Sequence, residues 1–288
     1  MSFSDFITQV PPGVRLLLAL AITIGVSLAC VKFFHNRMIH FDDKNREAAD
    51  KARAEAEARE EAEEPPISPR YEGPPETFYL AQRVLGLTAT GFVFLLAFTL
   101  ANFWGNANAA RTATVDEASM FARAVALSAS IPADQGGDQL RAGLKQYGRD
   151  VQVVQWPFLM RADSDAANNA QVLASSAVGK ATLEAGRAGA SKLPEWGLLT
   201  DSLKDMTADA TTRVTQLPGP FVPAIIWVIA MLGLVNLSLS AAFQPSRMGP
   251  NLFLIGIMAG ITGLLIFLVV ETSNPFVGGG AVTIPNLG

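Results

Sequence analysis

Apolar residues are gathered into four long runs, with polar segments between them. The runs are almost free of charge, and each reaches or approaches the roughly 20 residues that an α-helix needs to cross the hydrocarbon core of a bilayer. Lys32 lies near the end of the first run, where its long side chain can extend to the interface. The pattern predicts four membrane-spanning helices. The four runs are Val14–Phe34, Val84–Trp104, Phe221–Phe243 and Leu252–Val270.

The polar segments divide the chain into parts of different character. We predict an all-α integral membrane protein with four transmembrane helices and an α-helical extramembrane domain between helices 2 and 3. The first run is longer than the apolar core of a signal peptide, so we expect a retained helix. The expected parts are an N-terminal segment with helix 1 (1–34), a charged helix and Pro-rich linker (35–79), helix 2 (80–104), the extramembrane domain (105–219), helix 3 (220–243), helix 4 (250–272) and a C-terminal tail (273–288).

The segment 43–64 is rich in alanine and carries opposite charges four residues apart, a pattern that favours a helix. It has no large apolar residues at coiled-coil spacing, which indicates a solvated helix rather than a helix seam. A role in binding a partner stays open beside that interpretation. Pro65 and Pro66 end the helix, and the prolines and glycine that follow up to Pro75 predict an extended linker.

The long segment between the second and third runs has helical rather than alternating periodicity. The residues 131–137 contain proline and glycine and separate two amphipathic helices. Two weaker helices are expected around 166–188 and 195–216. The first amphipathic helix has an apolar face of Val115, Ala118, Phe121, Ala122 and Val125, and the second has one of Leu140, Leu144, Tyr147, Val151 and Val154.

The last two runs are joined by the short turn 244–250 and form an antiparallel hairpin. Gly256 and Gly260 make a GxxxG step, with Gly263 nearby, and glycines at this spacing let another helix approach closely. We interpret these three glycines as helix-packing positions. Three polar residues of the third run either bond across helices or line a polar path, and packing is the favoured use; they are Asn236, Ser238 and Ser240.

Composition and charge exclude several classes of function. Charged residues make up 17% of the chain, against about 25% in soluble domains, and the net charge is −4. The polar segments carry no basic patch with interleaved aromatic residues, so we expect no nucleic-acid partner. Cys30 is the only cysteine, and His35 and His40 are out of register on a helix. We therefore expect no metal site and no cofactor.

Catalytic constellations are also missing from the sequence. It contains no phosphate-binding loop, no metalloprotease motif and no spacing typical of a serine or cysteine nucleophile with its base. Asp116 and Glu117 stand side by side where we expect a soluble helix to begin, and acids are favourable at that end of a helix dipole. We predict that the protein is not an enzyme and has no catalytic residue.

Two phenylalanines in the second run present one candidate functional feature. Phe94 and Phe98 are four residues apart, so they lie about one helical turn from each other on one face. Asn102, Trp104 and Asn106 follow them towards the extramembrane domain. Such a face serves either helix or lipid packing or the lining of a hydrophobic constriction. Spacing does not decide between these two uses.

Two short motifs resemble those of a known family. The sequence Phe94-Leu-Leu-Ala-Phe98, followed by Trp104 and Asn106, resembles the second helix of bestrophins. Asn274, Pro275 and Phe276 after the fourth run resemble the bestrophin Asn-Pro-Phe-Gly, with a valine inserted here before Gly278. The whole pattern over roughly 80–280 is closer to the bestrophin-like domain family of bacteria. That pattern also includes the helix of Glu117 and the helix of Tyr147 with its Gln155-Trp156 end.

The resemblance implies four membrane helices per subunit, an α-helical extramembrane domain and, for true bestrophins, a pentameric anion channel. Phe94 and Phe98 would then form a hydrophobic neck that gates by dewetting, with Thr90, Asn102, Trp104 and Asn106 adjacent to the pore. Thr90 stands where bestrophins have a large apolar neck residue. The acidic cluster of the bestrophin calcium clasp is not found after Phe276, so calcium gating does not carry over.

We expect a multi-pass protein of the bacterial inner membrane whose partners are lipid and other subunits. Two functions stay open for it. The first is a homo-oligomeric, bestrophin-like ion channel, expected to conduct anions. The second is a non-conducting accessory, scaffold or assembly subunit of a larger membrane complex, which the lack of a charged pore lining, the small-residue packing face and the segment 43–64 favour. Basic residues place the termini outside, opposite to bestrophins; they are Lys32, Arg37, Lys44, Arg46 and Arg247.

Overall fold

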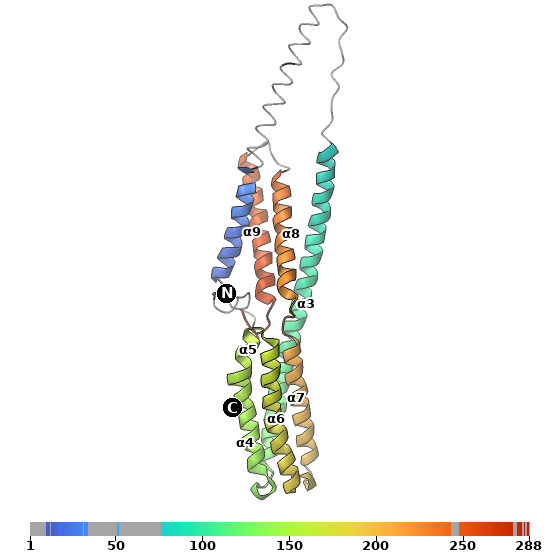
Figure 1. The fold of residues 1–288 in the computed structure, drawn as a ribbon, viewed down its shortest axis with the longest axis vertical. Helices are drawn as coiled ribbons and strands as arrows, with labels where there is room; N and C mark the ends of the chain where they lie inside the picture. The colour runs from blue at the N-terminus through green and yellow to red at the C-terminus, as the bar shows by residue number, and fades with distance from the viewer. Residues whose placement is uncertain are drawn as a thin grey trace, which may run out of the picture. The chain divides into compact units, whose positions relative to one another are not determined.

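A computed structural model describes most of the chain, and every regular element within it is helical (Figure 1). Among the described residues, four helices are long and apolar enough to cross a membrane, which confirms the predicted all-α membrane class. The charged segment 43–64 apart from Lys51, the linker to Pro75, His35, His40 and the turn residues 244–247 lie outside the described part. The described residues are 10–11, 13–30, 32–33, 51, 76–242, 248–278, 281–283, 285 and 287.

The first apolar helix, Gly13–Cys30, is followed along the chain by a long helix, α3, which begins at Glu76 and ends at Ala129. Short turns of 3-10 helix, η1 (Ala133–Gln135) and η3 (Ala190–Lys192), separate some of the later elements. The other elements are α4 (Gly137–Arg149), the π-helix η2 (Asp150–Gln155), α5 (Trp156–Met160), α6 (Ser164–Ala188), α7 (Trp196–Thr215), α8 (Val222–Ala242) and α9 (Met248–Thr272).

The structure divides into two compact units, and α3 contributes to both. The bundle unit contains the end of α3 from Phe98 onward together with α4 to α7, and it also includes the chain up to Arg15 and from Leu268 to the end. The membrane unit contains 16–97 and 226–267, and thus most of the four apolar helices.

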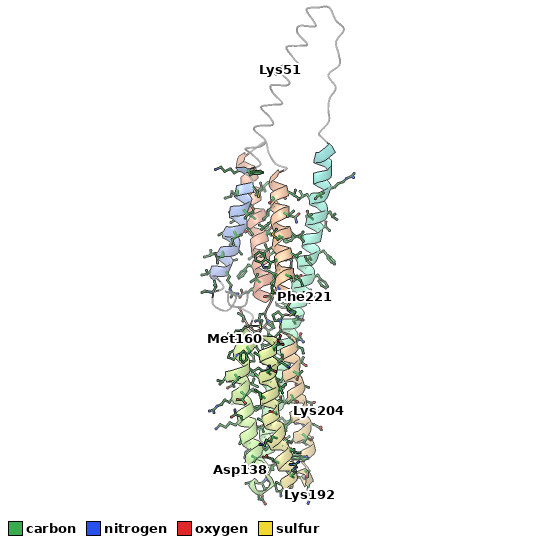
Figure 2. The ribbon with its side chains drawn as sticks, in the orientation of Figure 1. Lys51, Asp138, Met160, Lys192, Lys204 and Phe221 are labelled. Atoms are coloured by element: carbon green, nitrogen blue, oxygen red, sulfur yellow. The ribbon has the colours of Figure 1, made fainter. Side chains whose placement is uncertain are left out.

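The core of the bundle unit forms where α4 and α6 pack side by side (Figure 1). The predicted face of α4 is confirmed from Leu140 to Val151, whereas Val154 is exposed. A Cβ atom at Gly143 would lie 2.8 Å from the Cβ of Ala181, so glycine is what lets these two helices approach so closely. The charged side chains of Asp138, Lys192 and Lys204 lie on the outside of the unit (Figure 2).

Two predictions about α3 are wrong. No helix begins at Asp116, because α3 continues without a break through that point. The predicted apolar face is also misplaced, since Val115, Ala122 and Val125 are exposed and only Phe121 of that set is buried. The buried face instead includes the carboxylate of Glu117, which sequence periodicity assigns to the polar side. The side chains that face the bundle core are Ala113, Thr114, Glu117, Phe121, Ala124 and Ser128.

The membrane unit is held by close helix approach and by uncharged hydrogen bonds. A Cβ atom at Gly233 of α8 would lie 2.9 Å from the Thr262 methyl group of α9, so glycine leaves the room that this side chain occupies. The Thr88 hydroxyl donates to Asn236 Oδ1 at 2.8 Å, joining α3 to α8. Cys30 Sγ and Ser238 Oγ are 3.2 Å apart. Asn236 and Ser238 therefore bond across helices.

Candidate functional site

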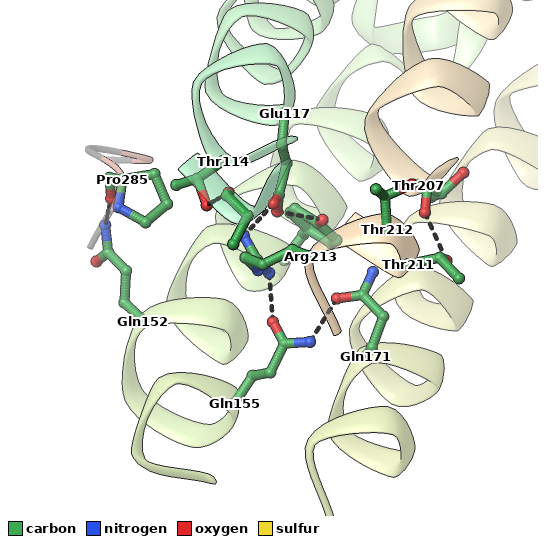
Figure 3. Close-up of polar contacts among 12 residues, drawn as sticks. Thr114, Glu117, Gln152, Gln155, Gln171, Thr207, Thr211, Thr212, Arg213 and Pro285 are labelled. Atoms are coloured by element: carbon green, nitrogen blue, oxygen red, sulfur yellow. Dashed lines mark hydrogen bonds and ion pairs between the residues drawn. The ribbon is translucent and has the colours of Figure 1, made fainter. Parts of the chain in front are cut away.

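Three fully buried side chains from three helices meet inside the bundle unit. Arg213 of α7 donates from Nη1 to Oε2 of Glu117 on α3, and the other carboxylate oxygen, Oε1, accepts a 2.7 Å hydrogen bond from the Tyr147 hydroxyl of α4. Figure 3 shows Glu117 and Arg213 turned towards each other. A charge pair without solvent is stable only if its remaining polar atoms are also bonded, so the neighbouring residues matter.

A chain of amides continues from the guanidinium (Figure 3). Arg213 Nη2 donates to Gln155 Oε1, and Gln155 Nε2 donates to Gln171 Oε1 at 2.8 Å. Gln171 in turn donates to the Ser175 hydroxyl at 2.9 Å. The Trp156 ring lies 5.5 Å from Arg213 Cζ, a cation–π distance. Together, these residues and the Glu117–Tyr147 pair form what we call the buried polar network.

The π-helix η2 positions two members of this network. Its wide turn ends where the Trp156 N–H bonds to the Val151 carbonyl, five residues back rather than four. A helix of this kind holds one residue more per turn than the flanking α-helix would, and such turns are frequent at functional sites. Val151 and Gln155 are both buried, and the Gln155 amide is directed at Arg213.

Burial controls the titration of the network. Glu117 lies beyond the apolar run of α3, and burial raises the pKa of its carboxyl above the usual range, although Arg213 and the Tyr147 hydroxyl act in the opposite direction. Burial, followed by the charge of Glu117, raises the pKa of Tyr147 well above that of a free phenol. Among the described residues, no group of three or more His, Cys, Asp or Glu side chains is placed to hold a metal ion. The arrangement therefore joins three helices inside the bundle unit.

The C-terminal motif packs beside the same network. Asn274 Nδ2 donates to the carbonyls of Leu159 and Met160 at 3.2 and 3.0 Å, while its Oδ1 accepts the Phe276 N–H at 3.0 Å. The Phe276 ring meets the Trp156 ring edge to face, with centroids 5.6 Å apart. Asn274, Pro275 and Phe276 are all buried, so the motif fastens the chain after α9 to the end of α5.

Gly278 completes this motif in a conformation that favours glycine. Its φ is +101°, and a Cβ atom there would lie 2.4 Å from Oε1 of Glu271. Glu271 also forms an ion pair with Arg15, 3.1 Å from Nη1 to Oε2, in which both side chains are largely buried. The sequence pattern did not predict this pair. The sequence indicates the pair only by two opposite charges, Arg15 just inside the first apolar run and Glu271 just after the fourth.

The predicted pore residues lie on the exposed side of α3. Phe94 is 72% exposed and Phe98 is 60% exposed, and Thr90, Asn102, Trp104 and Asn106 are exposed as well. The opposite side of the helix is buried, at Phe92, Leu96, Thr99 and Phe103.

These residues do not form one straight line. Each four-residue step advances about 40° around an α-helix, so Thr90 and Asn106 are separated by about 160°. Trp104 lies about 80° from Phe94 in the opposite sense to Asn102. The phenylalanines and Asn102 thus share a face, whereas Trp104 flanks it.

The three glycines of α9 have different surroundings. A Cβ atom at Gly263 would lie 2.5 Å from the Thr23 hydroxyl oxygen, so this glycine packs against the helix Gly13–Cys30. At Gly256 and Gly260 a Cβ atom would meet no atom within 4 Å in the described part of the chain. The GxxxG step is therefore open as far as the described residues show.

The four apolar helices and the helical bundle define an α-helical, multi-pass membrane protein. Residues 75–284 match the family model of the bestrophin-like domain, which is more than two thirds of the chain. The chain belongs to the bestrophin-like family, as its motifs indicated. No curated protein and no solved structure matches it.

Proposed function

We propose that this protein is a homo-oligomeric ion channel of the bacterial inner membrane, selective for anions, with Phe94 and Phe98 as its hydrophobic neck. The observation that carries the proposal is the exposed position of both rings in a single chain, on the side of α3 opposite its buried face. Rings placed in this way are available to surround an axis shared with other copies. A narrow ring of apolar side chains gates by dewetting.

Asn102 supports a water-lined path beside the neck. It is exposed, and its Nδ2 donates to the Phe98 carbonyl at 3.0 Å, which uses only one of the donors and acceptors of the amide. Polar atoms left unbonded in hydrocarbon are costly, and a water-filled cavity removes that cost. An asparagine on the same face as Phe94 and Phe98 is therefore better placed against water than against lipid.

Chloride flux into proteoliposomes tests the proposal. The Phe94→Ala/Phe98→Ala variant should raise flux about ten-fold, the effect of lowering a barrier by about 1.4 kcal/mol. The matched control is Phe253→Ala on α9, which removes a ring that is 70% exposed, and it should leave flux unchanged. Native-like flux in the double variant would overturn the neck, and absence of flux from the native protein would overturn the channel.

The open glycines of α9 favour a second candidate, a non-conducting scaffold or assembly subunit. Gly256 and Gly260 meet no neighbour within 4 Å in the described chain, so they offer a site of close approach to a helix of another protein. Purification in a mild detergent separates the two functions. Stoichiometric partners without flux would favour the scaffold, whereas a homo-oligomer with flux favours the channel.

For the orientation, we propose that both termini lie outside the cytoplasm. The basic residues Lys32, Arg37 and Arg247 support this topology under the positive-inside rule, in which acidic residues contribute little. Labelling of single introduced cysteines from one side of intact cells tests it. Labelling of an exposed position in α7 by an impermeant reagent from outside is the expected result, and protection there would reverse the assignment.

A further inference from the structure

The hydrogen bonds of the buried polar network close into a ring. Figure 3 shows the part that runs from Glu117 through Arg213 and Gln155 to Gln171. The ring returns from Gln171, whose amide bonds to the Tyr147 hydroxyl, and from that hydroxyl to Glu117. The members come from α3, α7, η2, α6 and α4, so one ring fastens all of these helices together.

The ring fits Glu117 in one protonation state only. Both carboxylate oxygens accept a hydrogen bond, Oε2 from Arg213 and Oε1 from Tyr147. A proton on Oε2 would face an N–H of the guanidinium, which can only donate. A proton on Oε1 would face the Tyr147 O–H, which would have to turn away and lose its acceptor. Uptake of one proton by Glu117 therefore breaks at least one bond of the ring.

Arg213 is the member of the ring that is placed to leave. Its Nε is buried and has no hydrogen-bond partner in the described part of the chain, and a buried donor without a partner is unfavourable. Arg213 also stands in the last turn of α7, which ends at Thr215. Opposite a neutral Glu117, the guanidinium would be an unpaired charge in the core. Protonation of Glu117 therefore favours movement of Arg213 towards solvent.

The ring lies where three of the four apolar helices continue into the bundle unit. Glu117 belongs to α3, which is unbroken from its apolar run onward. Arg213 stands nine residues before the start of α8 at Val222. The Trp156 ring beside the guanidinium contacts Phe276, in the segment that follows α9. A movement of Arg213 therefore acts on the segments that lead to α3, α8 and α9.

We propose that the buried polar network is a proton-operated latch. With Glu117 ionised, the ring is closed and fastens α3 to α4 and α7. When Glu117 takes up a proton, Arg213 leaves it, and α3 is released from the end of α7. Such a latch serves a channel and a scaffold alike, so it does not depend on conduction.

The groups around Glu117 set the direction of the response to pH. Burial raises the pKa of its carboxyl, Arg213 and Tyr147 lower it, and Asp209 of α7 acts in the same direction as burial. From η2 and α6 the ring receives only amides. Departure of Arg213 removes a contribution that lowers the pKa, so the pKa of Glu117 is higher in the open latch than in the closed one. By linkage, acid favours the open latch and alkali favours the closed latch.

Infrared difference spectra of the full-length protein in nanodiscs test the proton uptake. Acidification should produce the C=O stretch of a protonated carboxyl that is lost in Glu117→Gln, with a midpoint above the pKa of a free glutamate, about 4.3. Arg213→Met should move this midpoint to higher pH, because the cation that holds Glu117 ionised is gone. Arg187→Met removes an exposed guanidinium from α6 and is the matched control, which should leave the midpoint unchanged.

Hydrogen exchange at the end of α7 tests whether the ring opens. The reference is Glu117→Gln/Arg213→Met, because replacing both partners of a buried ion pair is tolerated better than removing one. Below the infrared midpoint, amides 210–215 of the native protein should exchange about ten-fold faster relative to this reference than at neutral pH, the effect of losing a hydrogen bond to a charged group. Glu184→Gln removes an exposed carboxyl from α6 and should behave as the native protein does.

Each measurement has a result that would overturn the latch. In the spectra, it is the lack of a Glu117 component before the bundle unit unfolds, or a midpoint that Arg213→Met does not move. In the exchange data, it is proton uptake without faster exchange at the end of α7. If Glu117→Gln alone does not fold, the double variant supplies the spectrum without Glu117. Neither measurement involves chloride flux, so the latch and the channel can fail separately.

Discussion

The two units of this protein bury polar groups in different ways. The bundle unit encloses a full charge pair, Glu117 with Arg213, and surrounds it with Tyr147 and Gln155. The membrane unit uses uncharged bonds such as that between Thr88 and Asn236, together with glycines at helix contacts. A buried charge that loses its partner costs several kcal/mol, whereas hydrogen bonds between membrane helices average about 0.6 kcal/mol. The bundle unit should therefore depend on a few residues and the membrane unit on many small contacts.

The largest expected effect comes from breaking the charge pair. Arg213→Met leaves the Glu117 carboxylate buried without its cation and should destabilise the bundle unit by about 3–5 kcal/mol. Hydrogen exchange of the α4 and α7 amides, read by mass spectrometry, reports the free energy of local unfolding. The amides of α8 should change less.

Arg187→Met is the control for that variant. It removes an exposed guanidinium from the last turn of α6 and should leave protection of α4 and α7 near native. If the two methionine variants behaved alike, the contrast between the units would be wrong.

A smaller effect should follow from removing the phenol of the network. Tyr147→Phe deletes the hydrogen bond to Glu117 and should cost about 1.5–3 kcal/mol, the range for bonds to charged groups. The measurement is the free energy of unfolding of the native protein and of this variant, both determined below pH 10.

The same variant has a pH signature. The pKa of Tyr147 is raised in the folded state, so its contribution is complete below the unfolded pKa of about 10. As pH rises from there through the folded pKa, the unfolded chain releases the proton first and the contribution is lost. Native protein should thus lose more stability above pH 10 than Tyr147→Phe does, and parallel curves would show that the phenol is not buried as described.

The smallest effect is expected in the membrane unit. Gly263→Leu would push a side chain into the helix Gly13–Cys30 and should cost about 1–3 kcal/mol, the usual range for overpacking. Gly256→Leu makes the same change on the same helix, where a Cβ atom meets nothing within 4 Å. Thermal unfolding in detergent should show a lower melting temperature for the first variant alone, and equal shifts would contradict the packing at Gly263.

Features set by local sequence were predictable. Long apolar runs have few alternatives to a spanning helix, and Leu140, Leu144 and Tyr147 are buried because they lie at helical spacing in an otherwise polar segment. The buried polar network was not predictable in this way. Glu117 and Arg213 are almost a hundred residues apart, and each looks like an ordinary surface charge until both are seen to face one core.

The orientation of α3 shows the same limit. Periodicity selected Val115, Ala122 and Val125 for the core, yet these are exposed and the core side carries Glu117. Apolar residues lie on both sides of α3, at Phe121 on the buried side and at Val115 and Val125 on the exposed side. Only knowledge of which side Arg213 occupies decides between them.

The π-helix η2 has a consequence for how the length of this protein can vary. Deleting a residue from an α-helix turns everything after it by about 100° relative to what precedes it. Between Asp150 and Gln155 the chain already holds one residue beyond the α-helical turn, so a single deletion there converts the wide turn to an ordinary one. Tyr147 and Trp156 would keep their directions. Among descendants of this sequence, that short stretch is where a codon could be lost with the least disturbance to the helices on either side.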